Sequence, residues 1–194
     1  MVSPLELPDI RNITISGRIG SGATTLAKHL SEKLNWKLLE GGELFEKIHN
    51  QLHLDQSIVA KRPDHFDLEY EEKIKKMLHD ESHNIIQSHL AGYDAKGIDE
   101  VFKILIVCED EDGNDKTEVR IDRLMNRDNK SLEEAKNEVL EREKGHLEKF
   151  RRLYADGDPD WVYWDRKYYD LVINTYAHNK DQTYEKALEG LGIK

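Results

Sequence analysis

The chain has 194 residues, a length that fits one domain with a full hydrophobic core. Charged residues make up 35% of it and the net charge is −10, which predicts a soluble protein and argues against a nucleic-acid-binding surface. One cysteine excludes an internal disulfide, and the sequence shows neither a signal peptide nor an apolar run of about 18 residues, so we expect a cytoplasmic protein without a membrane span.

The most informative segment spans residues 12–34, NITISGRIGSGATTLAKHLSEKL. A β-branched run enters the glycine-rich turn 17–22, and a helical stripe leaves it at Leu26, Leu30 and Leu34. A strand, a glycine loop and a helix in this order let backbone N–H groups and a helix N-terminus bind a phosphate chain. An ordinary tight turn that uses glycine for its positive φ is the alternative.

Two positions in this segment decide what the loop can do. The spacing is that of the P-loop motif GxxxxGK[ST], and Thr24 stands where that motif places the hydroxyl that binds Mg²⁺. Ala23 stands where the motif places the lysine that binds phosphate. The sequence therefore predicts a polyphosphate-binding loop and leaves open whether the loop still supports catalysis.

Along the rest of the chain, short apolar runs alternate with longer helical patterns, which predicts a parallel doubly wound sheet. The predicted strands cover residues 12–16, 36–39, 84–88, 102–108 and 170–174. The predicted helices cover residues 23–34, 42–53, 64–82, 116–127, 131–153 and 180–191, and the fifth opens with the capping box of Ser131 and Glu134. Ligands of such sheets bind beyond the carboxyl ends of the strands, where the turn 17–22 would lie.

Three polar patterns between the loop and the basic region are weaker signals. His49 and His53 are four residues apart, but they lack the third ligand of a zinc site, so chance explains them better. His89 follows the third predicted strand and could either donate to a phosphate or play a structural role; both interpretations stay open. The acidic run 109–115 lacks the glycine of a calcium loop, and we expect it to be a solvated connector.

The basic residues concentrate in one part of this acidic chain. Residues 116–152 contain eleven Lys and Arg against nine Asp and Glu. Two consecutive predicted helices each carry a basic stripe: Arg120, Arg123 and Arg127, then Arg142, His146 and Lys149. Such stripes can fold over a triphosphate and stabilise the charge on a transferring phosphoryl group. Solvated helix faces with ion pairs between neighbouring residues are the alternative.

With these motifs assembled, the chain resembles the nucleoside monophosphate kinases, and most closely the archaeal-type cytidylate kinases, over residues 12–190. ITISGRIGSGATTLAKHLSEKL is similar to the opening of that family, which tolerates a residue other than lysine at position 23. LLEGGELF resembles the segment that receives the acceptor nucleotide, HLAG resembles the end of the EGRLAG element, and YYDLVINT is similar to the last strand. VRIDRLMNR and SLEEAKNEVLEREKGHLEKFRRLY resemble the lid helices.

The resemblance implies a single domain over residues 1–194 with the P-loop NTPase fold. This fold is a three-layer α/β/α arrangement around a five-stranded parallel sheet, with helical insertions for the acceptor at about 41–83 and for the lid at about 116–155. The implied activity is transfer of the γ-phosphoryl group of ATP, with Mg²⁺, to CMP or dCMP. We expect a monomer with small-molecule nucleotides as partners, and neither nucleic acid nor a membrane.

The resemblance also implies a role for particular residues. ATP would be bound by Gly17, Arg18, Ile19, Gly20, Ser21, Gly22, Ala23, Thr24 and Thr25, with Thr24 at the metal. The acceptor would be bound by Gly41, Gly42, Gln87, His89 and Gly92. The catalytic cations would be Arg120, Arg123, Arg142 and Lys149.

Departures from the family pattern fall on the acceptor side. Glu46 and His89 stand where the family has arginines, and Leu68 replaces another expected arginine. Gln87 replaces a glutamate expected near Mg²⁺. Exchanging a bidentate phosphate donor for a carboxylate turns attraction into repulsion, and the nearby cations that could substitute are Lys61, Arg62 and Lys73. Two alternatives therefore stay open: a non-catalytic ATP-binding or regulatory protein, and a kinase of a different small acceptor.

Overall fold

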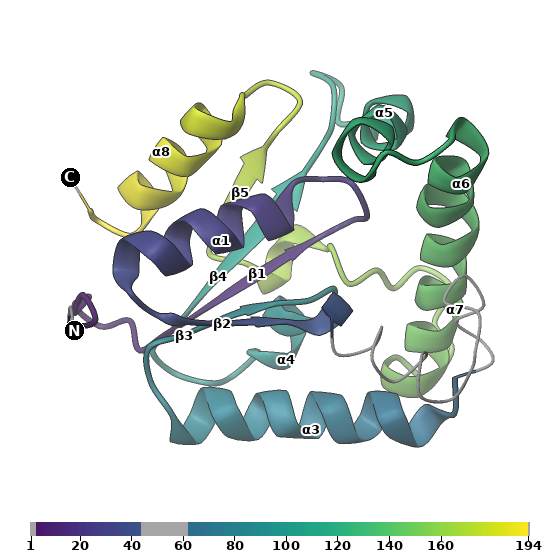
Figure 1. Cartoon of the computed structure of the whole chain (residues 1–194). Helices are drawn as coiled ribbons and strands as arrows, with labels where there is room; N and C mark the ends of the chain where they lie inside the picture. Colours follow the sequence, from purple (N-terminus) through teal and green to yellow (C-terminus); the bar gives the residue numbers. More distant parts are fainter. Residues whose placement is uncertain (1–2, 44–61, 194) are drawn as a thin grey trace.

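The computed structural model describes residues 3–43 and 62–193. Five strands form one sheet in the order β2-β3-β1-β4-β5, and every pairing between neighbouring strands is parallel (Figure 1). The strands are Asn12–Gly17 (β1), Lys37–Glu40 (β2), Asn84–Gln87 (β3), Val101–Val107 (β4) and Leu171–Asn174 (β5). The predicted parallel sheet is confirmed, because each predicted strand coincides with an observed one.

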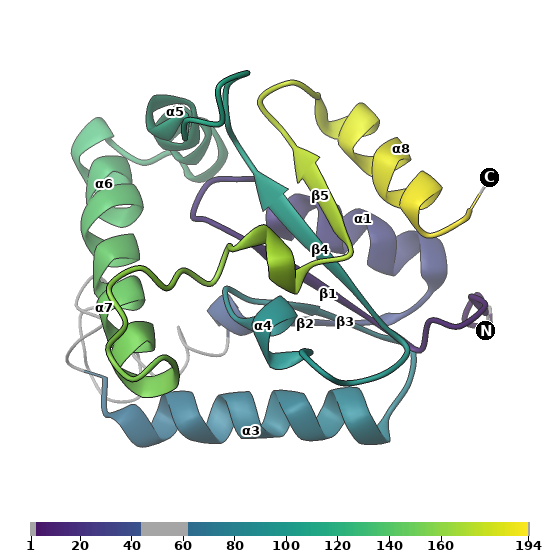
Figure 2. The ribbon, with the colours of Figure 1, turned by 180° about the vertical axis from the view of Figure 1, so that it is seen from behind.

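Helices cover both faces of this sheet. They are Ala23–Leu34 (α1), Asp64–Asp80 (α3), Ala91–Asp94 (α4), Thr117–Asp128 (α5), Leu132–Lys136 (α6), Glu143–Tyr154 (α7) and Lys180–Gly190 (α8). α1 and α8 pack on one face, and α3 and α4 lie on the other, as the two opposite views show (Figure 1 and Figure 2). The helix predicted at 42–53 lies largely outside the described residues. Outside them too are Glu46, His49, His53 and Lys61. None of the described helices is long and apolar enough to cross a membrane.

The helix predicted over 131–153 is interrupted. The capping box that opens it is confirmed, since Ser131 Oγ accepts from Glu134 N at 3.3 Å and the Glu134 carboxylate accepts from Ser131 N at 2.8 Å. A π-helical turn over Asn137–Arg142 then separates α6 from α7. Because a π turn uses i→i+5 hydrogen bonds, spacing counted across it does not predict a common helix face. The prediction of one continuous α-helix was wrong on this point.

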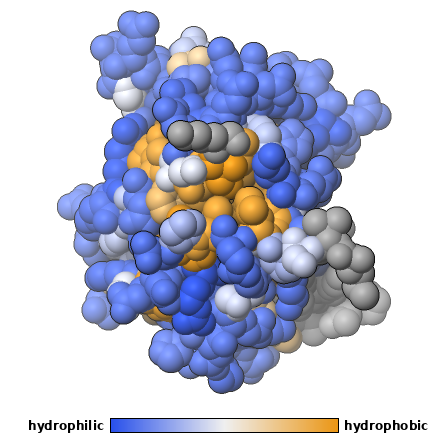
Figure 3. Space-filling view, turned by 90° about the vertical axis from the view of Figure 1, so that its left-hand side faces the viewer, coloured by the Kyte–Doolittle hydropathy of each residue, from blue (hydrophilic) through white to orange (hydrophobic). Residues whose placement is uncertain are grey.

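Apolar side chains between the layers fix the position of the sheet. Between the sheet and the pair α1 and α8, the fully buried members include Ile13, Ile15, Leu26, Leu30 and Leu34. On the opposite face they include Ile74, Leu78 and Ile86. Each such side chain contributes about 1.5–3 kcal/mol when fully buried. On the side of the molecule where the chain ends lie, apolar residues gather inside a hydrophilic surround (Figure 3). This packing holds the carboxyl end of β1, from which the glycine loop emerges.

Candidate functional site

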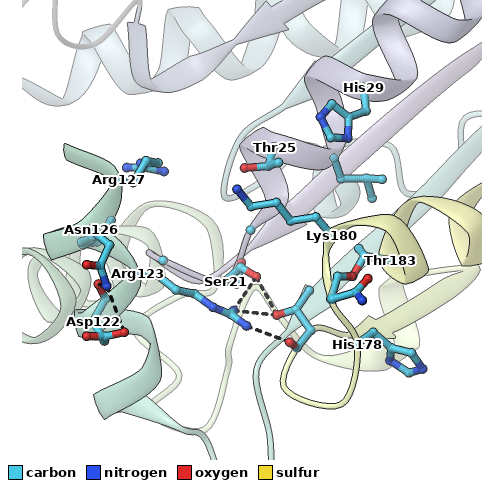
Figure 4. Close-up of a pocket in the computed structure, with 16 residues that line it drawn as sticks. Ser21, Thr25, His29, Asp122, Arg123, Asn126, Arg127, His178, Lys180 and Thr183 are labelled. Atoms are coloured by element: carbon cyan, nitrogen blue, oxygen red, sulfur yellow. Dashed lines mark hydrogen bonds between the residues drawn. The ribbon is translucent and has the colours of Figure 1, made fainter.

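The glycine loop lies at the carboxyl end of β1, and a cavity opens on each side of it. The outer chamber, of about 470 Å³, is bordered by α1, α5 and the start of α8 (Figure 4). The inner chamber, of about 180 Å³, is bordered by the loop, the end of β3 and the start of α7. Residues that line both chambers are Gly20, Gly22, Leu124 and Arg127. A polyphosphate chain along the loop would therefore reach both chambers.

Two glycines give the loop its shape. Gly20 and Gly22 have φ values of +78° and +107°, in the left-handed region that other residues rarely adopt. A Cβ on Gly20 would also lie 2.6 Å from the carbonyl oxygen of Arg120. Gly22 is the N-cap of α1 and supplies no side-chain cap, so the first N–H groups of the helix keep their capacity to bind an anion. This geometry supports the polyphosphate-binding interpretation of the loop.

Polar side chains hold alternate carbonyl oxygens of the loop. The contacts are His89 Nδ1 with Gly17 O at 3.1 Å, Arg120 Nη1 with Ile19 O at 2.7 Å, and both Arg123 Nη1 and Thr175 Oγ1 with Ser21 O at 3.2 and 2.8 Å. A carbonyl oxygen repels a phosphate oxygen unless a donor lies between them. Because these carbonyls are already paired with the protein, the loop is organised before any ligand binds.

A partly buried ion-pair network connects the loop to α5 and to the start of α7. Arg18 lies 3.1 Å from Asp115 and 2.5 Å from Glu143, and Arg120 lies 2.9 Å from each of the same two carboxylates. Glu143 also accepts a hydrogen bond from Ile19 N at 3.1 Å. Arg120 is 1% exposed and lines neither chamber, so its contact with ATP stays a prediction. The expectation of a solvated connector was wrong for Asp115, because two arginines compete successfully with water for its carboxylate.

Side chains from three helices meet in the outer chamber. Figure 4 shows Thr25 and His29 from α1, Arg123 and Arg127 from α5, and Lys180 and Thr183 from α8. Lys180 extends across the chamber toward Thr25, and the sequence analysis missed it. The sequence did contain a signal for Lys180. The helix macrodipole disfavours a cation at the first residue of a helix, so a lysine there indicates a role other than helix stabilisation. Lys180 brings an ammonium group to a loop that has none at position 23.

Four of the five predicted acceptor residues line the inner chamber, namely Gly41, Gly42, Gln87 and His89. Gly92 does not. Its N–H donates to Ser16 Oγ at 3.0 Å, and a Cβ at this position would overlap the ring of Tyr169. Close packing therefore accounts for a glycine here, and a contact with the acceptor stays a prediction.

Buried polar groups without partners concentrate in the inner chamber. His146 is 5% exposed, and neither of its ring nitrogens has a hydrogen-bond partner among the described residues. Arg142 Nε also has no hydrogen-bond partner among these residues. The ring centroids of His146 and His89 are 5.0 Å apart. Burial lowers the pKa of His89, and burial together with the neighbouring His89 and Arg142 lowers the pKa of His146 further, so both rings are neutral near pH 7.

The two predicted lid cations lie in different surroundings. Arg142 lines the inner chamber, with Nη1 3.6 Å from a Glu138 carboxylate oxygen. Lys149 is buried: its Nζ lies 2.7 Å from Asp67 Oδ2 and donates to the carbonyl oxygen of Arg62 at 2.6 Å. Arg62, a candidate substitute for the missing arginines, donates from Nε to Asp67 Oδ2 at 3.0 Å. In this structure Lys149 and Arg62 join α7 to the start of α3, and a role for either at a ligand stays a prediction.

Thr24 is the residue that fits a magnesium ion. Its Oγ1 faces the inner chamber beside the loop and makes a hydrogen bond of 3.3 Å to Gln87 Oε1. Within residues 3–43 and 62–193, no group of three His, Cys, Asp or Glu side chains could hold a metal. Magnesium prefers oxygen ligands and commonly keeps waters and substrate phosphates in its shell. The ion would therefore arrive with ATP, and Thr24 would supply one protein oxygen.

Comparison with known proteins connects this geometry to a family. Residues 64–177 match the cytidylate kinase-like family. The chain belongs to this family. It is 31% identical over 184 residues to the cytidylate kinase of Methanopyrus kandleri, covering 89% of this chain and 88% of that protein. It is 32% identical over 172 residues to the cytidylate kinase of Natronomonas pharaonis, covering 87% and 83% of the two proteins.

Solved structures support the fold assignment. An uncharacterized protein from Eubacterium ventriosum superposes with a TM-score of 0.64 at 17% identity, covering 95% of this chain and 99% of that one. A gluconokinase from Sinorhizobium meliloti gives a TM-score of 0.55 at 15% identity, with 94% and 91% coverage. A shikimate kinase from Acinetobacter baumannii gives 0.51 at 17% identity, with 94% of each chain covered. The predicted P-loop kinase fold is confirmed.

Proposed function

We propose that this protein transfers the γ-phosphoryl group of ATP to a nucleoside monophosphate, with CMP or dCMP as the acceptor. The observation that carries the proposal is that one glycine loop lines two chambers at once. A reaction between two nucleotides requires this arrangement, because their phosphates must meet in line while the two nucleosides lie apart. Membership of the cytidylate kinase-like family supports CMP or dCMP as the acceptor.

The proposed mechanism depends mainly on positioning. The nucleoside of ATP occupies the outer chamber beside Arg123 and Lys180, and its phosphates lie along the loop toward the N-terminus of α1. When bound, Mg²⁺ neutralises charge on the phosphates, and Thr24 supplies an oxygen to it. The acceptor phosphate enters the inner chamber beside Arg142 and His146. No covalent intermediate is needed, because the acceptor oxygen attacks the γ-phosphorus directly.

The lid helices complete the site. The network of Arg18, Arg120, Asp115 and Glu143 holds the start of α7 against the loop, so α5–α7 cover the reacting groups. A cover of this kind excludes water, which would otherwise accept the phosphoryl group and hydrolyse ATP. Cations that line the chambers, Arg127 and Arg142 among them, stabilise the charge that spreads over the transferring group.

A coupled assay of ADP release tests the proposal. ATP and Mg²⁺ are combined with each common nucleoside and deoxynucleoside monophosphate, and with cytidine and small alcohols beside them. CMP or dCMP should give the fastest ADP release. No release above background with any monophosphate would remove the proposal. Release with cytidine or an alcohol alone would indicate a kinase of a different small acceptor.

A non-catalytic ATP-binding or regulatory protein is the second candidate. It is favoured by the internal ion pairs of Arg120, Lys149 and Arg62, which leave fewer cations for ligand phosphates. Under this alternative, calorimetry detects binding of an ATP analogue, no monophosphate binds at millimolar concentration, and there is no turnover. Efficient phosphorylation of CMP would exclude it.

A further inference from the structure

The inner chamber contains two histidines whose hydrogen-bonding capacity is only partly used. His146 is 5% exposed, and within the part of the chain that the structure describes neither ring nitrogen has a partner. His89 lines the same chamber from the end of β3, with its ring centroid 5.0 Å from that of His146. Buried polar groups in native folds are nearly always satisfied by protein, water or ligand. The two rings therefore indicate that a polar ligand group belongs between the loop and α7.

The contact of His89 with the loop fixes which of its nitrogens carries the proton. Gly17 O is a carbonyl oxygen and can only accept, so Nδ1 of His89, 3.1 Å away, is the donor. The neutral ring then has only a lone pair left at Nε2. A phosphate dianion also offers only lone pairs. A neutral His89 therefore cannot donate to a phosphate, whereas a protonated one donates to both Gly17 and the phosphate.

We propose that His89 and His146 form a proton-linked binding site for the phosphate group of the acceptor nucleotide. On binding, the pair takes up one proton from solvent. Protonated His89 keeps Nδ1–H on Gly17 O and donates Nε2–H to a phosphate oxygen, while neutral His146 donates its single N–H to a second oxygen. This inference rests on the proposed function, because that function places the acceptor phosphate in the inner chamber.

The charged groups around the two histidines set the direction of the linkage. The positive charges of Arg142, Arg62 and Lys149 oppose protonation of the histidines. The negative charge of Glu143 favours protonation of His89. The ring centroid of Tyr163 lies 5.2 Å from that of His89. Tyr163 stays neutral because burial raises its pKa well above 10. Burial is the largest opposing contribution, so the unliganded pair has lowered pKa values. The negative charge of a bound phosphate acts in the opposite sense and raises them.

The expected consequence is an acceptor affinity that increases as the pH falls. Between the lowered pKa of the free pair and the raised pKa of the bound pair, one linked proton changes affinity about tenfold per pH unit. The phosphate of CMP itself titrates near pH 6, where its dianion is lost. Measurements above about pH 7, where the phosphate is a dianion, therefore isolate the contribution of the histidines. Because the two rings interact, the proton belongs to the pair as a whole.

Calorimetry on the full chain, saturated with a non-hydrolysable ATP analogue and titrated with CMP, tests the proposal. Titrations at about pH 7 in two buffers of different ionisation enthalpy give the number of protons taken up. We expect about one proton per CMP, and an affinity that weakens about tenfold when the pH rises by one unit. CMP binding with no proton uptake and no pH dependence would overturn the inference while leaving the proposed function intact.

Two variants and a control sharpen the test. His89→Arg supplies a permanent cation, so CMP should bind without proton uptake; uptake unchanged from the parent chain would contradict the proposal. His146→Phe keeps a ring but removes the N–H donor, so it should weaken CMP binding about tenfold without weakening the ATP analogue, if each histidine holds one phosphate oxygen. His79→Gln, an exposed histidine on α3, should change neither quantity. The melting temperature of each variant confirms that it is folded. An ATP analogue that binds while CMP binds at no pH would contradict both the proposed acceptor and this inference.

Discussion

The two chambers on either side of the glycine loop are built differently. Among the described residues, the outer chamber has one lining side-chain atom that is buried without a hydrogen-bond partner, Ser21 Oγ. The inner chamber has three: Arg142 Nε and both ring nitrogens of His146. Groups that are already paired hold their geometry before a ligand arrives, whereas unpaired buried groups depend on the ligand for satisfaction. The difference teaches that the outer chamber is preorganised and that the inner chamber is completed by what binds there.

The largest expected effect, on ATP affinity, comes from substituting Gly22, which lines both chambers. Gly22→Val should weaken binding of an ATP analogue at least about hundredfold, because the φ of +107° strains any other residue and the added side chain enters the path of the phosphates. Calorimetric titration measures the loss. Gly97→Val is the matched control: Gly97 also has a positive φ, of +77°, but lines neither chamber, so ATP affinity should be unchanged. Unchanged affinity in Gly22→Val would contradict the assignment of the loop.

The next effect concerns the ion-pair network of Arg18, Arg120, Asp115 and Glu143. Glu143→Ala leaves Arg120 buried with one carboxylate fewer, and Ile19 N without its acceptor. We expect the free energy of unfolding to fall by about 3–5 kcal/mol, as when one partner of a buried ion pair is removed. Urea unfolding measures this. Glu118→Ala removes an exposed pair with Lys116 and should lower the free energy of unfolding far less than Glu143→Ala does. Equal stabilities of the two variants would show that the network does not hold the start of α7 against the loop.

A smaller effect separates the two chambers. Lys180→Met should weaken binding of the ATP analogue about tenfold and leave CMP affinity unchanged, because Lys180 reaches only the outer chamber. Lys186→Met, also an exposed lysine on α8 but remote from both chambers, is the control. If both variants bind ATP equally well, Lys180 does not replace the ammonium group that position 23 lacks.

The smallest expected effect, on the free energy of unfolding, comes from an ion pair that lies outside both chambers. The hydrogen bond from Arg152 lowers the pKa of Asp64 from 3.8 to about 2. A lowered folded-state pKa stabilises the fold above pH 3.8, and this contribution disappears as the pH falls through about 2. The pair is solvent-exposed, so Arg152→Ala should lower the free energy of unfolding only slightly at neutral pH. Urea unfolding at pH 7 and near pH 2 should show a difference from the parent chain only at pH 7.

The fold was predictable from the sequence because its signals are local. Apolar runs predict the buried strands, and the glycine spacing predicts the loop 17–22. The capping box of Ser131 and Glu134 predicts the start of a helix. Each of these features depends on residues a few positions apart. The π turn over Asn137–Arg142 has no comparable signature, and for that reason the sequence predicted one unbroken helix.

The candidate site was predictable from the sequence only for the glycine loop, whose shape depends on the backbone. The glycine loop lies where the motif places it, but the arginine stripe does not act as a unit, since Arg120 is buried against Asp115 and Glu143 while Arg123 holds Ser21 O. Helical spacing predicts which side chains share a helix face. It does not predict which carboxylates from other elements will bind those side chains. The same limit hid Lys180, which reaches the loop only because α8 packs beside α1.

A crystal structure with a bisubstrate analogue tests the central claim most directly. The analogue joins adenosine to cytidine through a polyphosphate chain and should occupy both chambers together. We predict adenosine in the outer chamber beside Arg123 and Lys180, phosphates along the amides of the glycine loop, and the cytidine-side phosphate next to His146. A loop without phosphates, or an analogue bound with its two nucleosides exchanged, would contradict the account.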